Sequence, residues 1–320
     1  MEVSVVVPTY RRTDYLEKCL DALKQQLKPA KQVIVTVRET DQETWAFLDR
    51  YPRGSLPLDL VCVEVPGVIA ALDRGFSRAS GEIIAMIDDD AQAFPDWIQR
   101  LEVHYQSNPR IGAVGGKDWI YDNGEPQPGN PQPVVGRLQW FGRPIGNHSL
   151  GFGEAREVDI LKGVNMSFRK QAIGDLTFDP RLLGTGAQVH FEMSFCLALK
   201  RAGWRIIYDP NIAVNHYRAQ RYDEDQRHTF IAEADYNQVY NETLAVLDHL
   251  WMPQRFAFLL WAVLIGTRSA RGVVQTLRFL PQEQQWAIAR LQSSLRGRWD
   301  AWRAWHRDPQ TPTGATIYQG

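Results

Sequence analysis

A chain of 320 residues is long enough for one large α/β domain and a smaller appendage. Its 44% hydrophobic and 23% charged residues are typical of a globular protein with a filled core, which excludes a disordered or fibrous chain. The formal net charge of −1 argues against a nucleic-acid partner, because such partners select strongly basic proteins.

Three cysteines, Cys19, Cys62 and Cys196, lie far apart in the sequence. Their spacing fits neither a metal site nor a disulfide framework, which favours a reducing compartment. The sequence starts directly with an apolar run and lacks the basic segment and cleavage site of a signal peptide. We therefore expect a cytoplasmic protein.

Strands and helices are predicted to alternate through the first 115 residues. Apolar, β-branched runs predict strands, and apolar residues spaced three and four apart predict helices. The predicted strands cover residues 3–7, 33–37, 60–65, 82–87 and 111–115, and the predicted helices cover residues 16–27, 40–51, 68–79 and 95–106. This alternation predicts a mostly parallel, Rossmann-like sheet with helices on both faces.

The next part of the chain is less regular. Residues 122–157 are rich in Pro and Gly and predict a long loop region over the site, with short strands near residues 138–141. Order resumes with a predicted strand at residues 161–168, a helix at 191–202, a strand at 205–208 and a longer helix at 229–250.

Three consecutive aspartates, Asp88, Asp89 and Asp90, follow one predicted strand directly. Ligands of parallel sheets bind at the carboxyl ends of the strands. Because strand side chains alternate, Asp88 and Asp90 can share a cation while Asp89 faces elsewhere. Oxygen ligands suit Mg²⁺ or Mn²⁺, with phosphates completing the shell. The alternative is a solvated acidic turn or a helix cap before Pro95.

Four motifs occur in an order that resembles the inverting glycosyltransferases of family 2, which have the GT-A fold. They are VSVVVPTYR at residues 3–11, ASGEIIAMIDDD at 79–90, KGVNMSFR at 162–169 and AGWRIIYDP at 202–210. Together they span about residues 1 to 217. The resemblance implies a GT-A fold, a nucleotide-sugar donor and a divalent metal, Mn²⁺ or Mg²⁺.

The resemblance also implies roles for single residues. Asp90 corresponds to the metal-binding aspartate, Asp88 to the one that faces the nucleoside and can share the metal, and His216 to a histidine that often helps to bind metal or diphosphate. Glu192 corresponds to the base that deprotonates the acceptor hydroxyl, with His190 as the next candidate. The implied substrate-binding residues are Pro8, Thr9, Tyr10, Arg11, Glu39, Asp73, Asp88, Asn165 and Arg169.

Some positions depart from the family pattern. Glu39 stands where a base-reading aspartate is usual, Asp73 replaces part of an Arg-Asn pair, and Phe191 replaces the first acid of the pair that Glu192 completes. Each assignment has a structural alternative. Glu192 could be an exposed helix position, His216 a loop histidine, and Asn165 and Arg169 packing residues at a strand end.

The C-terminal part of the chain has its own pattern. Between residues 252 and 307 there are nine arginines, only two acids and five of the eleven tryptophans. An unbroken apolar run at residues 256–265 rises about 15 Å as a helix, too little to span a bilayer. Trp and Arg on amphipathic helices predict binding to an anionic membrane surface, and the alternative is a helical hairpin packed on the domain.

These features predict three segments: a catalytic domain at residues 1–217, divided near residue 120 into a nucleotide-binding and an acceptor half, a helical membrane-associated segment at 218–307, and a flexible tail at 308–320. The predicted function is metal-dependent, inverting sugar transfer from a nucleotide-sugar, by default UDP-linked, to a glycan or lipid-linked acceptor. Its place is the inner face of the cell membrane, in cell-surface polysaccharide synthesis. Two alternatives are a catalytically silent sugar-nucleotide- or glycan-binding regulatory relative and a nucleotidyltransferase.

Overall fold

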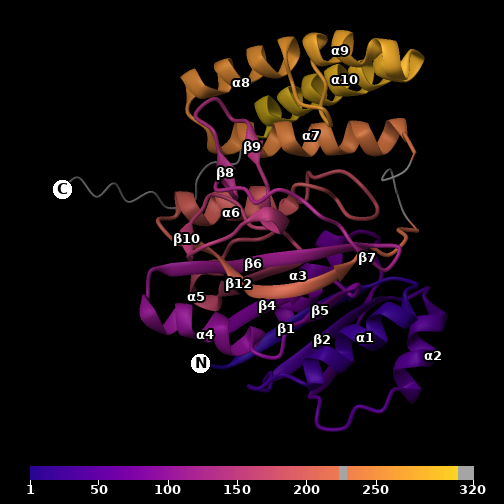
Figure 1. Cartoon of the computed structure of the whole chain (residues 1–320), viewed down its shortest axis with the longest axis vertical. Helices are drawn as coiled ribbons and strands as arrows, with labels where there is room; N and C mark the ends of the chain where they lie inside the picture. The colour runs from indigo at the N-terminus through magenta and orange to yellow at the C-terminus, as the bar shows by residue number, and fades with distance from the viewer. Residues whose placement is uncertain (223–228, 309–320) are drawn as a thin grey trace.

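The computed structural model describes residues 1–222 and 229–308. The tail expected over residues 308–320 lies outside the described part of the chain apart from its first residue. A central sheet lies below a layer of C-terminal helices (Figure 1).

The main sheet has the strand order β10-β12-β6-β11-β4-β1-β2-β3. Pairing is parallel among β1 to β4 and between β6 and β12, whereas β11 is antiparallel to both of its neighbours. The strands are β1 (Val3–Thr9), β2 (Gln32–Arg38), β3 (Leu58–Val63), β4 (Ile83–Ile87), β6 (Ile111–Asp122), β10 (Arg156–Glu157), β11 (Asn165–Arg169) and β12 (Arg205–Tyr217). Short strands β5 (Ala91–Ala93) and β7 (Glu125–Pro126) add to β12 and β6, and β8 (Arg137–Leu138) pairs separately with β9 (Pro144–Ile145).

Helices cover both faces of the sheet, as the sequence predicts. Alternation along β1 places Val5 in one core cluster with α1 and α4, and Val6 in the other with α3 and α6. The helices are α1 (Thr13–Lys24), α2 (Gln42–Arg50), α3 (Val68–Arg78), α4 (Trp97–Ser107), α5 (Lys170–Ile173), α6 (Phe191–Arg201), α7 (Ala232–His249), α8 (Met252–Leu264), α9 (Val273–Glu283) and α10 (Gln285–Arg307), with a 3₁₀ turn at His148–Leu150. The predicted fold class, an α/β sheet with a C-terminal helical segment, is confirmed.

Strand β12 extends well past its predicted end at residue 208. Its pairing with β6 breaks between Asp209 and Ala213 and then continues to Tyr217. At this bulge a Cβ on Gly116 would lie 1.7 Å from the carbonyl oxygen of Ile212, so only glycine fits there. The extension carries His216 to a position beside the turn after β4, where it pairs with Ala91.

The C-terminal helices join the same core as the sheet. Tyr240 and Leu244 of α7 and Ala301 of α10 belong to the cluster that contains Phe195 of α6. Helices α7 and α10 therefore share a hydrophobic core with α6, which precedes residue 217. Among the described residues no helix combines the length and the apolar character needed to cross a membrane.

Candidate active site

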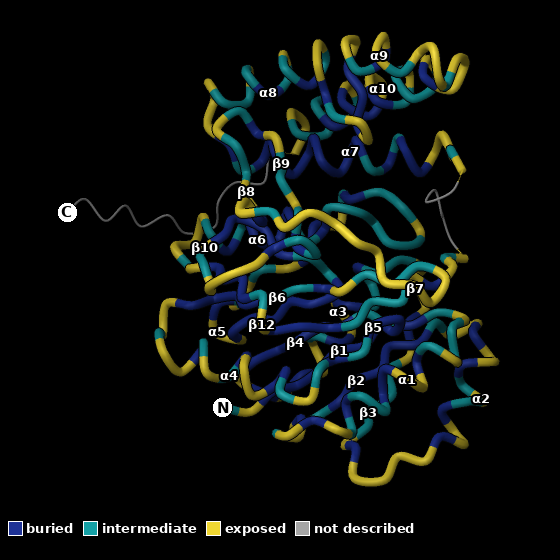
Figure 2. Tube along the Cα trace, in the orientation of Figure 1, coloured by how far each residue is buried: buried dark blue, intermediate teal, exposed yellow. Residues whose placement is uncertain are grey.

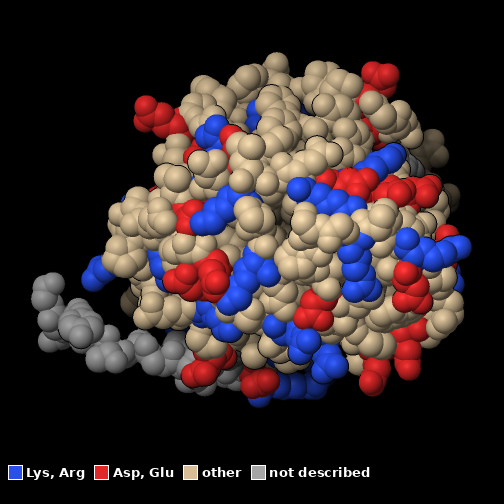
Figure 3. All heavy atoms as spheres, turned by 90° about the horizontal axis from the view of Figure 1, so that it is seen from below, with Lys and Arg blue, Asp and Glu red and all other residues tan. Residues whose placement is uncertain are grey.

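A cavity of about 400 Å³ opens at the carboxyl ends of β1, β2 and β4. Its floor and walls include the turn after β1, the three aspartates and the first turn of α6. The residues that line it include Pro8, Thr9, Tyr10, Arg12, Arg38, Asp88, Asp89, Asp90, Lys162, Glu192, His216, Arg218, Arg221 and Tyr222. The face of the molecule seen from below carries interspersed basic and acidic side chains, without a continuous basic stripe (Figure 3).

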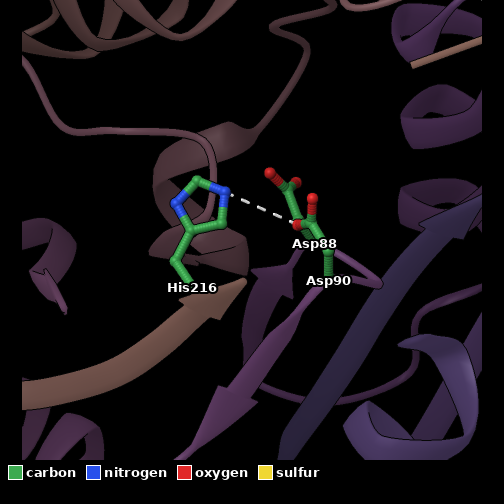
Figure 4. A group of neighbouring side chains, drawn as sticks. All are labelled: Asp88, Asp90 and His216. Carbon is green, nitrogen blue, oxygen red and sulfur yellow. Dashed lines mark ion pairs between the residues drawn. The ribbon is translucent and has the colours of Figure 1, made fainter. Parts of the chain in front are cut away.

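Asp88, Asp90 and His216 form a compact group in which one ligand atom from each lies within 4.8 Å of the others. All three side chains converge from the turn after β4 and the end of β12 (Figure 4). Nε2 of His216 lies 3.6 Å from Oδ1 of Asp90. This Oδ1 atom is buried and has no hydrogen-bond partner among the described residues. Two carboxylates, one imidazole and an unsatisfied buried oxygen fit a divalent cation.

The carboxylates at this group repel one another. Burial raises the pKa of Asp88, and the neighbouring charge of Asp90 raises it further. Burial likewise raises the pKa of Asp89 to about 7, although the charge of Arg12 opposes the change. A bound cation would favour the ionised forms that burial disfavours.

Asp89 is not part of this group and has partners of its own in the turn after β4. Its Oδ2 accepts a hydrogen bond of 2.7 Å from the hydroxyl of Thr9, and its Oδ1 lies 3.1 Å from Nη1 of Arg12. The same Nη1 lies 3.1 Å from Oδ2 of Asp90. Arg12 is not among the residues predicted from the sequence to line the site. Its position directly after the first motif, at residues 3–11, is the one signal that could have pointed to it.

His216 is held on its other side by Asp118 of β6. Its Nδ1 lies 3.1 Å from Oδ2 of Asp118, and Lys162 forms an ion pair with the same oxygen. Burial alone would raise the pKa of Asp118, but the hydrogen bond with His216 and the charge of Lys162 lower it to about 2. Asp118 lies beyond the predicted end of its strand and in no recognised motif, so no sequence pattern pointed to it.

Glu192 lines the cavity from the first turn of α6. Burial raises its pKa, and the charge of Asp88 adds to this effect, while that of His190 opposes it. His190 adopts a left-handed conformation with φ of 76° and lies 3.8 Å from Glu242 of α7. Of these two candidate bases, only Glu192 lines the cavity.

The edge near β2 is aromatic and cationic. The guanidinium of Arg38 lies 3.9 Å from the ring centroid of Tyr10, and Tyr222 meets the same ring edge-on. Pro8 and Thr9 adjoin this edge of the cavity. Glu39 is exposed and does not line it, whereas Thr36 and Arg38 of β2 do, and Arg38 is the neighbour of the position expected for base recognition.

Five of the residues assigned to substrate binding, Glu39 among them, do not line the cavity. Asn165 is buried, donates to the carbonyl oxygens of Lys117 and Ile212, and accepts from the indole of Trp97. Arg169 donates to backbone carbonyls of Tyr105, Asn108 and Ile111. Both side chains are held by these internal hydrogen bonds, which is what the alternative of a packing role at a strand end predicts. The exposed residues Arg11 and Asp73 also lie outside the lining.

Residues 4–176 match the family described as glycosyl transferase family 2. The "Glucosyl-dolichyl phosphate glucuronosyltransferase" of Haloferax volcanii is 32% identical over 232 residues, which are 68% of this chain and 69% of that protein. The chain therefore belongs to glycosyl transferase family 2, and it is a glycosyltransferase.

Two solved structures share the fold at low sequence identity. A structure of GalNAc-T7 with UDP, GalNAc and Mn²⁺ superposes with a TM-score of 0.62 at 15% identity, over 82% of this chain and 50% of that one. A structure of Staphylococcus aureus TarS residues 1–349 with UDP-GlcNAc gives a TM-score of 0.54 at 15% identity, over 95% of this chain and 92% of that one. These similarities confirm the GT-A fold.

Proposed function

We propose that the protein is a metal-dependent, inverting glycosyltransferase that moves a sugar from a UDP-sugar to a lipid-linked acceptor. The observation that carries this proposal is the single cavity shared by Glu192 and the group of Asp88, Asp90 and His216. Glu192 lies near enough to this group for the charge of Asp88 to raise its pKa. The proposed base and the proposed metal-binding group, which would hold the leaving diphosphate, thus line the same cavity.

Asp88, Asp90 and His216 would hold Mn²⁺ or Mg²⁺, and a bound ion would supply Lewis-acid stabilisation of the leaving diphosphate. Arg218 and Arg221 line the same cavity and supply positive charge for phosphate oxygens. Tyr10 and Arg38 offer a flat surface and a cation at the edge where the resemblance places the nucleotide base.

Glu192 takes the proton of the acceptor hydroxyl while the oxygen of that hydroxyl attacks the anomeric carbon. The bond from that carbon to the acceptor oxygen forms while the bond to the diphosphate oxygen breaks. Attack opposite the leaving group inverts the anomeric configuration. A carboxylate with a raised pKa accepts this proton more readily than an ordinary one, so burial of Glu192 suits the role.

The lipid-linked acceptor and a membrane location are supported by the C-terminal helices and by the name of the Haloferax relative. Met252, Phe256, Leu260 and Leu264 are exposed at four-residue spacing along α8, and Leu277 is exposed on α9. Figure 2 shows exposed segments recurring along both helices on the side away from the sheet. We place this surface on the anionic inner face of the cell membrane, where the enzyme would contribute to cell-surface polysaccharide synthesis.

Not every arginine of this segment can serve such a surface. Arg271 and Arg298 are buried and pair with Glu283 and Glu242. The more exposed arginines, including Arg268 and Arg278, remain for contact with anionic headgroups. The apolar stripe is therefore expected to contribute more to binding than the net charge of the sequence suggests.

The test is a screen of UDP-, GDP- and other nucleotide-sugars with Mn²⁺ or Mg²⁺, with and without polyprenyl phosphate acceptors. Metal-dependent release of nucleotide that rises with a lipid acceptor supports the proposal, and the anomeric configuration of the product tests inversion. Donor binding without turnover for any pair would instead favour a catalytically silent relative.

A further inference from the structure

One buried carboxylate beside the cavity has no role in the mechanism above. Asp118 has 0% exposure, and no recognised motif contains it. It contacts His216, which belongs to the metal-binding group, and Lys162, which lines the cavity. We propose that Asp118 is a positioning residue that fixes the ring of His216, with Nε2 directed at the cation. This inference rests on the proposed metal dependence.

Strand pairing places the two side chains together. Asp118 of β6 pairs with Val214 of β12 in the parallel register, and His216 lies two residues further along β12. Residues two apart on a strand share a face, so Asp118 and His216 are diagonal neighbours on one side of the sheet. The contact is therefore determined by the backbone and does not depend on a mobile loop.

The chemistry of the pair selects one tautomer. An ionised carboxylate only accepts hydrogen bonds, so Nδ1 of His216 must carry a proton to donate to Asp118. In neutral histidine the free lone pair is then on Nε2, the atom that lies 3.6 Å from Oδ1 of Asp90. Lys162 on the same Asp118 oxygen favours the ionised carboxylate. Metal-binding histidines commonly have such a partner, which orients the ring and fixes its tautomer.

A second His-Asp pair provides a matched control. His104 of α4 lies 2.8 Å from Oδ2 of Asp209, which is also buried, and neither residue lines the cavity. Asp118→Asn and Asp209→Asn make the same chemical change to the carboxylate of a His-Asp pair that is only partly exposed. Any loss of metal affinity that arises only from a weakened fold should appear in both variants.

The experiment measures Mn²⁺ binding to the full chain by electron paramagnetic resonance, with and without UDP. We expect Asp118→Asn and Asp118→Ala to lower Mn²⁺ affinity about 10- to 100-fold, as for other groups that support metal ligands. Asp209→Asn is expected to leave the affinity close to that of the wild type. In ¹⁵N spectra of the wild type without metal, the proton of neutral His216 should lie on Nδ1.

The outcomes separate the two proposals. Wild-type protein that binds no Mn²⁺, even with UDP, overturns the proposed metal dependence and this inference with it. Wild-type binding with equal affinity in both Asp118 variants overturns this inference alone. If the Asp118 variants do not fold, the wild-type spectrum still decides, because a proton found on Nε2 of neutral His216 contradicts the assignment.

Discussion

Replacing Glu192 with Gln removes the proposed base and keeps the size of the side chain. General base catalysis contributes about 10²- to 10⁴-fold to a rate. We expect transfer to fall at least ~100-fold, which corresponds to about 2.7 kcal/mol of transition-state stabilisation. Donor affinity should change little, because the metal-binding group and Tyr10 are untouched.

The structure also predicts how this variant affects stability. Burial raises the pKa of Glu192 above its ordinary value of 4.5, so folding disfavours the ionised form. Below pH 4.5 the carboxyl group is neutral in both folded and unfolded protein, and wild type and variant should be about equally stable. As the pH rises from 4.5 to the folded-state pKa, the unfolded wild type ionises while the folded wild type stays protonated, so the wild type loses stability over this range, and above it the loss is constant. Glu192→Gln should therefore gain stability relative to the wild type with rising pH.

The assay measures transfer to a lipid acceptor from pH 4 to 9, together with urea unfolding of the same samples. Wild-type activity should fall on the acid side at a pH above 4.5, since Glu192 must be ionised to accept a proton. Glu102→Gln is the control, because Glu102 is a partly buried carboxylate on α4 outside the cavity. A folded Glu192→Gln enzyme with near wild-type transfer would refute the reasoning, and His190 would be the next residue to test.

Three further outcomes follow from the site and the surface. Asp90→Asn should abolish Mn²⁺-dependent UDP binding in calorimetry while the protein stays folded; unchanged metal-dependent binding would contradict the metal assignment. Asn165→Ala should lower the free energy of unfolding by ~3–9 kcal/mol, because three partners each lose a hydrogen bond at about 1–3 kcal/mol. The UDP affinity of the folded fraction should stay the same, and weaker affinity without lower stability would restore a substrate role. Wild-type protein should co-sediment with anionic vesicles more than with neutral ones and be partly released by salt. The double variant Phe256→Ser, Leu260→Ser should stay in solution. Equal, negligible pelleting of the wild type with both lipids would mean that these helices only pack on the domain.

The sequence by itself determined the strand-helix alternation and the position of the three aspartates at a strand end. These features are local: apolar residues at a spacing of two or of three to four define buried faces, and an acidic run after a buried strand marks a site. Alternation along a strand predicted a separate role for Asp89, and the structure gives Asp89 its own partner, Thr9, although residues 88–90 form a turn after β4. Helix periodicity likewise predicted a helix over residues 191–202, which puts Glu192 in the first turn of α6.

Only the tertiary structure decided which polar side chains reach the cavity. Asp118 meets His216 across 98 positions of sequence, and this contact depends on the pairing of β6 with β12 beyond a bulge that no local pattern announces. Asn165 stands in a family motif, yet its amide is used up by backbone groups far from it in the chain. Periodicity predicts that a side chain is buried, but the identity of its partner depends on strand register and chain path. Those are set by packing over the whole domain.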